Sequence, residues 1–343
     1  MNATIKDVAK LAGVSFKTVS RVINREPSVA DELRARVWKA IEELDYQPNL
    51  SARQLRGAAS CLAFIYDNVN SHCIIEMQNG MLAECNQQGF ELLIHPVDAS
   101  ADDYIAELRR VVNNSHVAGL VLAPPFSESE RLAEALRKQA VQFIRILSSG
   151  SQPAPPGPCV YVDDYRAAYA VTDYLIRLGH RSIGFLGGAM QERCSQQRLA
   201  GYRAALTAHG TAAAEQLILP GEYSFESGNE RTSHLLSMRA PPTAVIACND
   251  DIAAGALCAA RNQQLVVPQQ LSIAGFEDSP FSRQSWPSLT TTHQPNRAIA
   301  QAAANLLIDT IRATRQGNSL DAIRDKGFQP HLVVRDSTCA APA

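Results

Sequence analysis

The stretch that most constrains this chain is residues 4–24, TIKDVAKLAGVSFKTVSRVIN, because two short apolar stripes at helical spacing flank one glycine. Thr4 can cap the first helix, with Asp7 at its third position in a variant of the capping box. The apolar side of this helix is formed by Ile5, Val8, Leu11 and Ala12. Gly13 is expected to end it, because glycine readily adopts the left-handed conformation that closes a helix.

A second helix is predicted from Ser15, its N-cap, with an apolar face made by Val19, Val22 and Ile23. The opposite face then presents Phe16, Lys17, Ser20 and Arg21. Such a face suits the DNA major groove, where Arg and Lys read guanine edges and apolar groups touch thymine methyls. The alternative, a small helical hairpin with a solvated face, stays open on spacing alone.

A third helix is indicated by Leu33, Val37, Ile41 and Leu44, with Trp38 beside them, and Pro48 breaks the chain after it. Asn49 can cap a further short helix, LSARQLR, which is too short to be stable by itself. Within it, Leu55 either packs on the rest of the protein or acts as a wedge in a minor-groove base step.

The charge distribution agrees with a DNA-binding end. Through Gly57 there are 10 Lys and Arg against 7 Asp and Glu, whereas the remainder has 22 against 27. The eight cysteines form no CxxC pair, so we expect buried thiols in a reducing compartment and neither a metal site nor a cofactor. The N-terminus lacks the apolar core of a signal peptide and no run reaches the ~18 apolar residues of a membrane span, which predicts a cytoplasmic protein with no membrane partner.

Beyond Gly57, short apolar runs alternate with helical stretches, a pattern typical of α/β domains with helix-covered parallel sheets. The predicted strands are Leu62–Tyr66, Glu91–His95, Gly119–Leu122, Gln142–Ile146, Ser182–Leu186, Ala244–Ala247 and Ser272–Phe276. The Pro-rich stretch 148–158 is expected to be a surface loop between the two halves.

Four polar pairs directly follow apolar runs: Asp67 and Asn68, Asp163 and Asp164, Asn249 and Asp250, and Glu277 and Asp278. Ligands of open parallel sheets bind outside the carboxyl ends of the strands, so the four pairs together outline one crevice. Any single pair is also compatible with helix capping, and for Asp164 and Asp250 we favour the capping role.

Residues 4–57 resemble the DNA-binding head of the lactose-repressor (LacI/GalR) family of bacterial transcription regulators, through TIKDVAKLAGVSFKTVSRVIN and the pattern Y-x-P-N-x-x-A-R-x-L at residues 46–55. The resemblance implies a dimer on a pseudo-palindromic operator, with Phe16, Lys17 and Arg21 at base edges. A hinge helix would fold on the DNA. Its minor-groove residues would be Asn49, Ala52, Arg53 and Leu55. We assign contacts with the DNA backbone to Thr4, Ser15, Ser20 and Asn24.

The remainder resembles the family's effector domain, a relative of periplasmic sugar-binding proteins, through GHRSIGFLGG (179–188), RLAGY (198–202), PPTAVIACNDDIAAG (241–255), VPQQLSIAGFEDSP (267–280) and WPSLTTTHQP (286–295). The resemblance implies two α/β lobes around a ligand cleft, with Arg198, Asn249, Tyr223 and Glu277 among the effector contacts. The remaining candidate effector-binding residues are Asp67, Asn68, Cys73, Ile74 and Asp163.

Three departures from the family pattern bear on the effector. Glu277 replaces a usual aspartate, residues 71–74 lack an aromatic pair often found at the mouth, and Glu192 and Cys194 lie where purine-binding members place polar contacts. These departures favour a sugar or glycoside over a purine.

The expected organisation is a helix-turn-helix domain (1–48), a hinge helix and linker (49–59), and an effector-binding and dimerisation domain (60–343). Lobe 1 would comprise about 60–160 and 292–322, and lobe 2 about 161–291 and 323–343. The tail, FQPHLVVRDSTCAAPA, contains no heptad repeat from which a tetramerising coiled coil could be built, so a homodimer is expected.

The function indicated is an effector-controlled transcriptional repressor and not an enzyme. An enzyme on the α/β body is disfavoured because no G-x-G-x-x-G, GxxxxGK[ST] or GxSxG motif occurs. A third alternative, a solute-binding protein with no role on DNA, is disfavoured because the whole DNA-binding head is present at residues 1–57.

Overall fold

The computed structural model describes residues 3–23, 29–44, 46, 61–67, 72–101, 103–115, 117–148, 158–319 and 324–342. The chain forms two compact units, Met1–Ser60 and Cys61–Ala343, which we call the head and the body and describe separately. Some predicted features lie outside the described residues: Asn24, the hinge helix with Asn49, Ala52, Arg53 and Leu55, the effector candidate Asn68, and the loop at 149–157.

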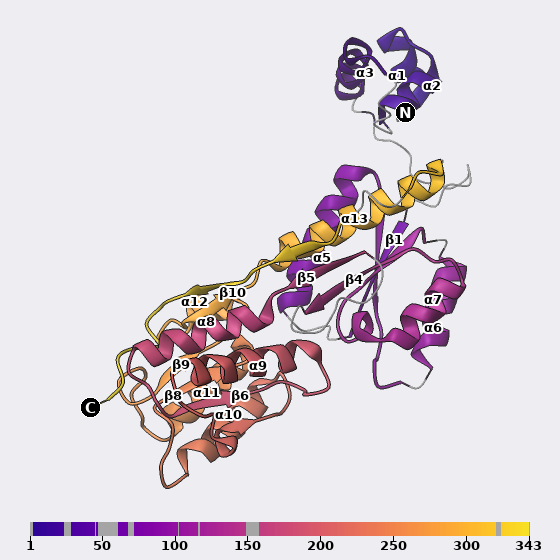
Figure 1. The fold of residues 1–343 in the computed structure, drawn as a ribbon. Coiled ribbons are helices and arrows are strands. Elements are labelled where there is room, and N and C mark those ends of the chain that lie inside the picture. The colour runs from indigo at the N-terminus through magenta and orange to yellow at the C-terminus, as the bar shows by residue number, and fades with distance from the viewer. Residues whose placement is uncertain are drawn as a thin grey trace. The chain divides into compact units, whose positions relative to one another are not determined.

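The head contains three helices in its described part, α1 (Ile5–Ala12), α2 (Phe16–Ile23) and α3 (Asp31–Glu43) (Figure 1). Thr4 and Asp7 form the predicted capping box, in which the Thr4 backbone N–H donates to Asp7 Oδ2 at 2.8 Å. Gly13 follows α1 with φ of 62°, as predicted. The prediction for Leu11 was wrong: its side chain is 46% exposed, and Ala9 is buried in the core instead.

The larger sheet of the body is parallel and six-stranded, in the order β11-β5-β4-β3-β1-β2. Its strands are β1 (Cys61–Tyr66), β2 (Glu91–Pro96), β3 (Gly119–Leu122), β4 (Phe143–Ser148), β5 (Cys159–Val162) and β11 (Lys326–Phe328). Alternate residues of β1 enter two different cores: Leu62 and Phe64 on one face, Ala63 and Ile65 on the other. Burial on both faces explains why these strands appear in the sequence as unbroken apolar runs.

Helices cover both faces of this sheet and complete lobe 1 (Figure 1). The core with Leu62 and Phe64 also contains residues of α5 (His72–Gln88) and α13 (Asn296–Gln316). The core with Ala63 and Ile65 contains residues of α6 (Tyr104–Asn114) and α7 (Glu130–Lys138), and a short 3-10 helix, η1 (Phe126–Glu128), follows β3. Gly80 allows α5 to pack closely on α13, because a Cβ there would overlap the Arg297 carbonyl.

Lobe 2 is built on a parallel four-stranded sheet in the order β7-β6-β8-β9. Its strands are β6 (Ile183–Leu186), β7 (Ile218–Leu219), β8 (Ala244–Ala247) and β9 (Ser272–Ala274). The helices around them are α8 (Asp164–Arg177), α9 (Arg193–Ala208), α10 (Phe225–Leu236), α11 (Asp250–Asn262) and α12 (Pro280–Gln284), with a 3-10 turn η2 (Glu215–Leu217) before β7. One continuous hydrophobic core joins sheet and helices.

The chain passes between the lobes at three places in its described part: from β5 to α8, from β10 (Thr291–His293) to α13, and from β11 to β12 (His331–Val333). Strands β10 and β12 pair antiparallel in a small sheet of their own (Figure 1). The expected lobe boundaries need correction, because β5 and β11 pair with each other inside the sheet of lobe 1. Lobe 1 therefore includes 161–162 and 326–328, which we had expected in lobe 2.

Across the described residues, no helix is long and apolar enough to cross a bilayer.

All eight cysteines are free thiols. Cys85, Cys159 and Cys248 are buried and the other five are half-buried, so the expectation that the thiols are buried holds for only three of them.

Candidate functional site

The outward face of α2 is the candidate DNA-reading surface of the head. Val19 and Val22 are buried against the other helices, which leaves Phe16, Lys17 and Arg21 exposed. The Phe16 side chain, 48% exposed, lies in the first turn of the helix beside Lys17. A large apolar side chain next to cations at the start of an exposed helix is an arrangement that suits contact with base edges in the major groove.

The hydroxyl groups assigned to the DNA backbone have local roles in the head. Thr4 caps α1, and the Ser15 hydroxyl accepts a hydrogen bond from the Thr18 backbone N–H at 3.1 Å, as a cap of α2 does. Ser20 is half-buried on α2. Caps place a hydroxyl and free backbone N–H groups together at a helix start, where a phosphate is readily bound.

The body contains a cavity of about 180 Å³ lined by residues of both lobes. Lobe 1 contributes a mainly apolar wall of Asp67, Cys73, Ile74, Met77, Ala123, Pro124, Pro125, Ile146, Leu147, Ser148 and Val162. Lobe 2 and the segment after β10 contribute a polar wall of Asp164, Glu192, Cys194, Arg198, Tyr223, Asn249, Asp251, Glu277 and Gln294. An occupant would therefore meet an apolar surface on one side and hydrogen-bonding groups on the other.

Seven of the nine predicted effector residues line this cavity: Asp67, Cys73, Ile74, Arg198, Tyr223, Asn249 and Glu277. Asp163 does not, because its side chain caps α8 by accepting from the Arg166 N–H at 3.0 Å. Asp164 takes its place in the cavity wall. The capping role that we favoured for Asp164 and Asp250 was wrong: Asp163 and Asn249 cap α8 and α11, and the second residue of each pair is buried.

Arg198 organises the polar wall. Its side chain is 4% exposed, and its Nε and Nη2 atoms lie 2.8 and 2.7 Å from Asp164 Oδ1. Nη1 donates to the Cys248 carbonyl and Nη2 also to Gln294 Oε1 at 3.3 Å, while the guanidinium lies 4.4 Å from the Phe276 ring centroid. Arg198 therefore holds together residues after β5, β8, β9 and β10.

Tyr223 lies against the same wall, fixed by its neighbours. Its hydroxyl shares hydrogen bonds with Ser195 Oγ at 2.5 Å and with Cys194 Sγ at 3.2 Å, and burial raises the pKa of the phenol. A Cβ at Gly188 would overlap the Tyr223 ring, so glycine is required where the ring crosses the chain after β6. The ring is thereby held as a rigid part of the cavity wall.

Glu277 enters the cavity from a strained backbone. Its φ is +102° and that of Asp278 is +55°, both in the region that L residues rarely adopt. No hydrogen-bond partner for the Glu277 carboxylate is found within the described part of the chain. Burial, with the negative charge of Asp250 as the next cause, raises the pKa of Glu277 to about 8. At neutral pH this carboxyl is largely protonated and can donate as well as accept a hydrogen bond.

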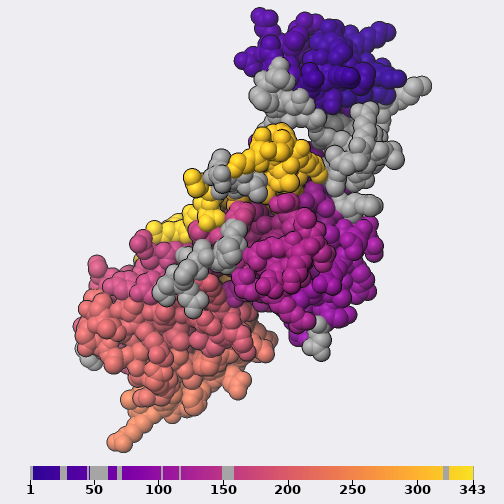
Figure 2. Space-filling model, turned by 45° about the vertical axis from the view of Figure 1, so that its right-hand side comes forward, coloured from indigo at the N-terminus to yellow at the C-terminus, as the bar shows by residue number. Residues whose placement is uncertain are grey.

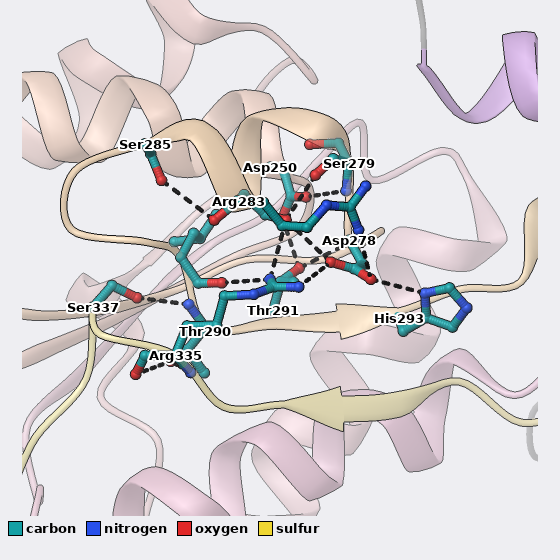
Figure 3. Close-up of polar contacts among 12 residues, drawn as sticks. Asp250, Asp278, Ser279, Arg283, Ser285, Thr290, Thr291, His293, Arg335 and Ser337 are labelled. Carbon is teal, nitrogen blue, oxygen red and sulfur yellow. Dashed lines mark hydrogen bonds and ion pairs between the residues drawn. The ribbon is translucent and has the colours of Figure 1, made fainter.

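The strained turn is held by a polar network behind the cavity (Figure 3). Asp278 accepts from Arg335 Nη2 at 2.5 Å, and its other oxygen lies 3.0 Å from His293 Nδ1. Asp250 accepts from the Ser279 N–H and from the Thr291 hydroxyl, both at 2.7 Å. These bonds fix the residues that flank Glu277 to α11, β10 and the C-terminal segment.

Acidic groups dominate the charge of the cavity. Among the described residues that line it, Arg198 is the sole basic side chain, and Asp164 neutralises it in a buried ion pair. Asp67, Glu192 and Asp251 add carboxyl groups without such a partner, whereas Glu277, largely protonated at neutral pH, adds a group that can donate as well as accept. Such a wall repels phosphate and carboxylate and offers many acceptors to hydroxyl groups.

Sequence reasoning missed Asp251 and Gln294 in the wall, and it missed Arg231 behind it. Asp251 lies directly after the pair Asn249 and Asp250, so extending that pair by one residue would have found it. Gln294 follows β10, a strand of only three residues that gave no separate sequence signal. Arg231 is a helical arginine without a motif around it.

Comparisons with known proteins agree with this arrangement. The family of bacterial regulatory proteins of the lacI type matches residues 4–49, and the periplasmic binding protein-like domain matches residues 172–338. A curated relative, the HTH-type transcriptional repressor PurR of Klebsiella pneumoniae (strain 342), is 31% identical over 99% of this chain and 98% of its own length.

Two solved structures are similar over nearly the whole chain. A complex of the transcriptional regulator CelR with cellobiose has a TM-score of 0.73 and 27% identity, covering 98% of this chain and 99% of its own. The lac repressor dimer bound to operator and the anti-inducer ONPF has a TM-score of 0.73 and 26% identity, covering 99% of this chain and all of its own.

Proposed function

The chain belongs to the lacI family of bacterial regulatory proteins, and we propose that, as a DNA-binding transcriptional repressor of this family, it binds a pseudo-palindromic operator as a homodimer under the control of a sugar or glycoside. The observation that carries the choice of effector is the cavity, with an apolar wall on lobe 1 and a polar wall whose one arginine is already neutralised. A sugar ring has C–H faces for the first wall and hydroxyl groups for the second.

The neighbours differ in what their names say about ligands. CelR is seen with cellobiose, whereas the relatives from Klebsiella and Erwinia carry the name PurR. The cavity favours the sugar, because its carboxylates and the Asn249 amide suit several hydroxyl groups. Among the described residues that line it, Tyr223 is also the one aromatic side chain against which a purine plane could stack.

A thermal-shift screen of the full chain tests the effector class. Cellobiose, maltose, lactose and ribose are compared with hypoxanthine, guanine and adenosine at equal concentrations. A ligand present at 100 times its dissociation constant adds ~2.7 kcal/mol of stability. Stabilisation by a sugar supports the proposal, and stabilisation by a purine base alone overturns the choice of effector.

In the head, we propose that Phe16, Lys17 and Arg21 read bases while Thr4, Ser15, Ser20 and Asn24 contact phosphates. Asn49, Ala52, Arg53 and Leu55 are proposed for the minor groove. Selection from random duplexes at moderate salt tests this assignment. Arg21→Ala should relax selection at one position of each half-site, at a cost of ~1–3 kcal/mol.

The matched control for Arg21 is Lys39→Ala, which removes an exposed cation from α3 without touching α2. If Arg21→Ala weakens all duplexes equally, then Arg21 contacts phosphate and not a base. If the unmodified protein shows no sequence-selective binding, the proposal that it binds an operator is contradicted.

A further inference from the structure

The N-terminus of α9 is capped from the opposite lobe. Its own N-cap residue, Glu192, makes no side-chain capping bond, and the Arg193 backbone N–H donates instead to Glu128 Oε2 at 3.0 Å. Glu128 ends η1, directly before α7 of lobe 1, whereas α9 belongs to lobe 2. A carboxylate at this position accepts from a backbone N–H that has no acceptor within the helix, and it lies at the positive end of a 16-residue helix.

This contact depends on the lobes being close together, as they are in Figure 2, where the magenta residues of lobe 1 touch the pink residues of lobe 2. Burial raises the pKa of the Glu128 carboxyl, and its Oε1 is buried with no hydrogen-bond partner among the described residues. If the lobes separated, water would hydrate both the carboxylate and the helix end. The bond therefore exists in the closed arrangement and is replaced by hydration in an open one.

A second polar bond between the lobes differs in its position. Ser148, at the end of β4, donates to Asp164 Oδ2 at 2.7 Å, and Asp164 comes two residues after β5, at one of the crossing segments. Rotation about the crossing segments displaces atoms near them little. Glu128 and Arg193 lie on segments that do not cross between the lobes, so their contact depends on the angle between the lobes.

The capped residue lies between two residues of the cavity wall. Glu192 and Cys194 both line the cavity, and Cys194 shares a hydrogen bond with the Tyr223 hydroxyl. An occupant that touches either side chain constrains the backbone of Arg193 between them. Effector contacts and the contact with Glu128 therefore act on the same turn of α9.

We propose that Glu128 is a positioning residue that latches the two lobes by capping α9 across the cleft, so that occupancy of the cavity is transmitted to the angle between the lobes. The proposal rests on the proposed function for its effector, but the latch itself is a property of the protein without ligand. It assigns to η1 a role in regulation in addition to its place in the fold of lobe 1.

The test uses the full chain without ligand and two variants of one residue. Glu128→Ala removes the acceptor, whereas Glu128→Gln keeps an acceptor oxygen and removes the charge. Glu134→Ala is the matched control, because Glu134 is an exposed carboxylate on α7 whose Lys138 partner lies 3.9 Å away. Amide hydrogen exchange in peptides covering residues 192–197 and small-angle scattering of the whole protein are measured for all four proteins.

The expected result is exchange about threefold to tenfold faster in Glu128→Ala, the range for one lost hydrogen bond, together with a larger radius of gyration. Glu128→Gln should give values between those of Glu128→Ala and the unmodified protein, because it keeps an acceptor oxygen but loses the charge at the positive helix end, and Glu134→Ala should change neither. Unchanged exchange and scattering in Glu128→Ala would overturn the latch, as would a Glu128→Gln variant as open as the alanine one. Operator selection by the same variants tests the proposed function separately, since it does not require the latch.

Discussion

At the scale of single residues, Arg198 and Asp164 form the buried ion pair on which the polar wall depends. Replacing Arg198 by Met keeps much of the side-chain volume but leaves Asp164 buried without its cation. Breaking one partner of a buried pair costs ~3–5 kcal/mol, so we expect Arg198→Met to lower the free energy of unfolding of the body by about that amount. Urea unfolding followed by circular dichroism measures the change.

The control for this prediction is the double variant Arg198→Met with Asp164→Asn, which removes the charge left behind. It should regain part of the lost stability while still failing to bind the effector. If the single and double variants are equally unstable, then the loss arises from packing around Phe276 and Cys248 and not from the unpaired carboxylate.

Glu277 should make stability depend on pH. Its pKa is about 8 in the folded protein against an ordinary 4.5, so the folded state holds a proton that the unfolded state has released. Stability should therefore fall as pH rises from about 4.5 to about 8, by at most ~1.4 kcal/mol per pH unit. Glu277→Gln should flatten the profile between about pH 6 and pH 8, above the titration of Asp250, whose pKa is about 6. Parallel profiles for the two proteins in urea unfolding would contradict the raised pKa.

The residue scale also shows where sequence reasoning ends. The sequence indicated that an acidic pair follows β5, but not which member points to the cavity. One residue of register decides this, because Asp163 caps α8 and Asp164 turns inward to Arg198. Helix starts inferred from sequence are uncertain by one or two residues, and the direction of a side chain reverses within that interval.

At the scale of elements, Arg231 of α10 joins the ends of two strands of lobe 2. Its Nη1 donates to the carbonyls of Gly187, after β6, and Leu219, in β7, at 2.5 and 2.7 Å. Its Nη2 donates to the Glu222 carbonyl at 3.2 Å, next to Tyr223. The guanidinium thus holds together the two segments that bring Gly188 under the Tyr223 ring.

Arg231→Lys should loosen this part of the cavity wall. A lysine keeps the charge but lacks the planar fork, so at least one buried carbonyl loses its donor at a cost of ~1–3 kcal/mol. We expect a lower melting temperature and weaker binding of the sugar identified by thermal shift. Arg239→Lys is the matched control, on an exposed residue just after α10. Unchanged affinity in Arg231→Lys would show that Tyr223 is held by Ser195 and Cys194 alone.

Elements with strong apolar runs were predicted well, because burial on both faces of a parallel sheet leaves an unbroken signal. The runs Gly119–Leu122 and Ala244–Ala247 became β3 and β8 with the same bounds. Strand β11 was not predicted: its three residues, Lys326 to Phe328, are mostly exposed and gain their place only by pairing with β5. Pairing partners distant in sequence leave no local pattern, which is why the lobe boundary at 323 was wrong.

At the scale of the whole molecule, the outer surface of lobe 2 has a feature that a monomer does not explain. Trp286 is 96% exposed and lines a groove of about 1130 Å³ together with Phe225, Val266 and Phe281. Large exposed apolar side chains gathered around a concave surface mark interaction sites. In the proposed homodimer, a two-fold axis at this groove would bring the projecting tryptophan of each copy against the apolar groove of the other.

Trp286→Glu should therefore convert the proposed dimer to monomer, because it places a charge where the interface would exclude water. Two linked heads gain ~10²–10⁴-fold through effective concentration, so operator affinity should fall by a factor in that range while the fold of each subunit keeps its stability. Sedimentation equilibrium and operator titration on the same samples measure both effects, with Arg239→Glu as the control for a charge change on the surface of lobe 2. A Trp286→Glu variant that remains dimeric would place the two-fold contact elsewhere. A variant that becomes monomeric but binds operator with undiminished affinity would show that the heads act independently.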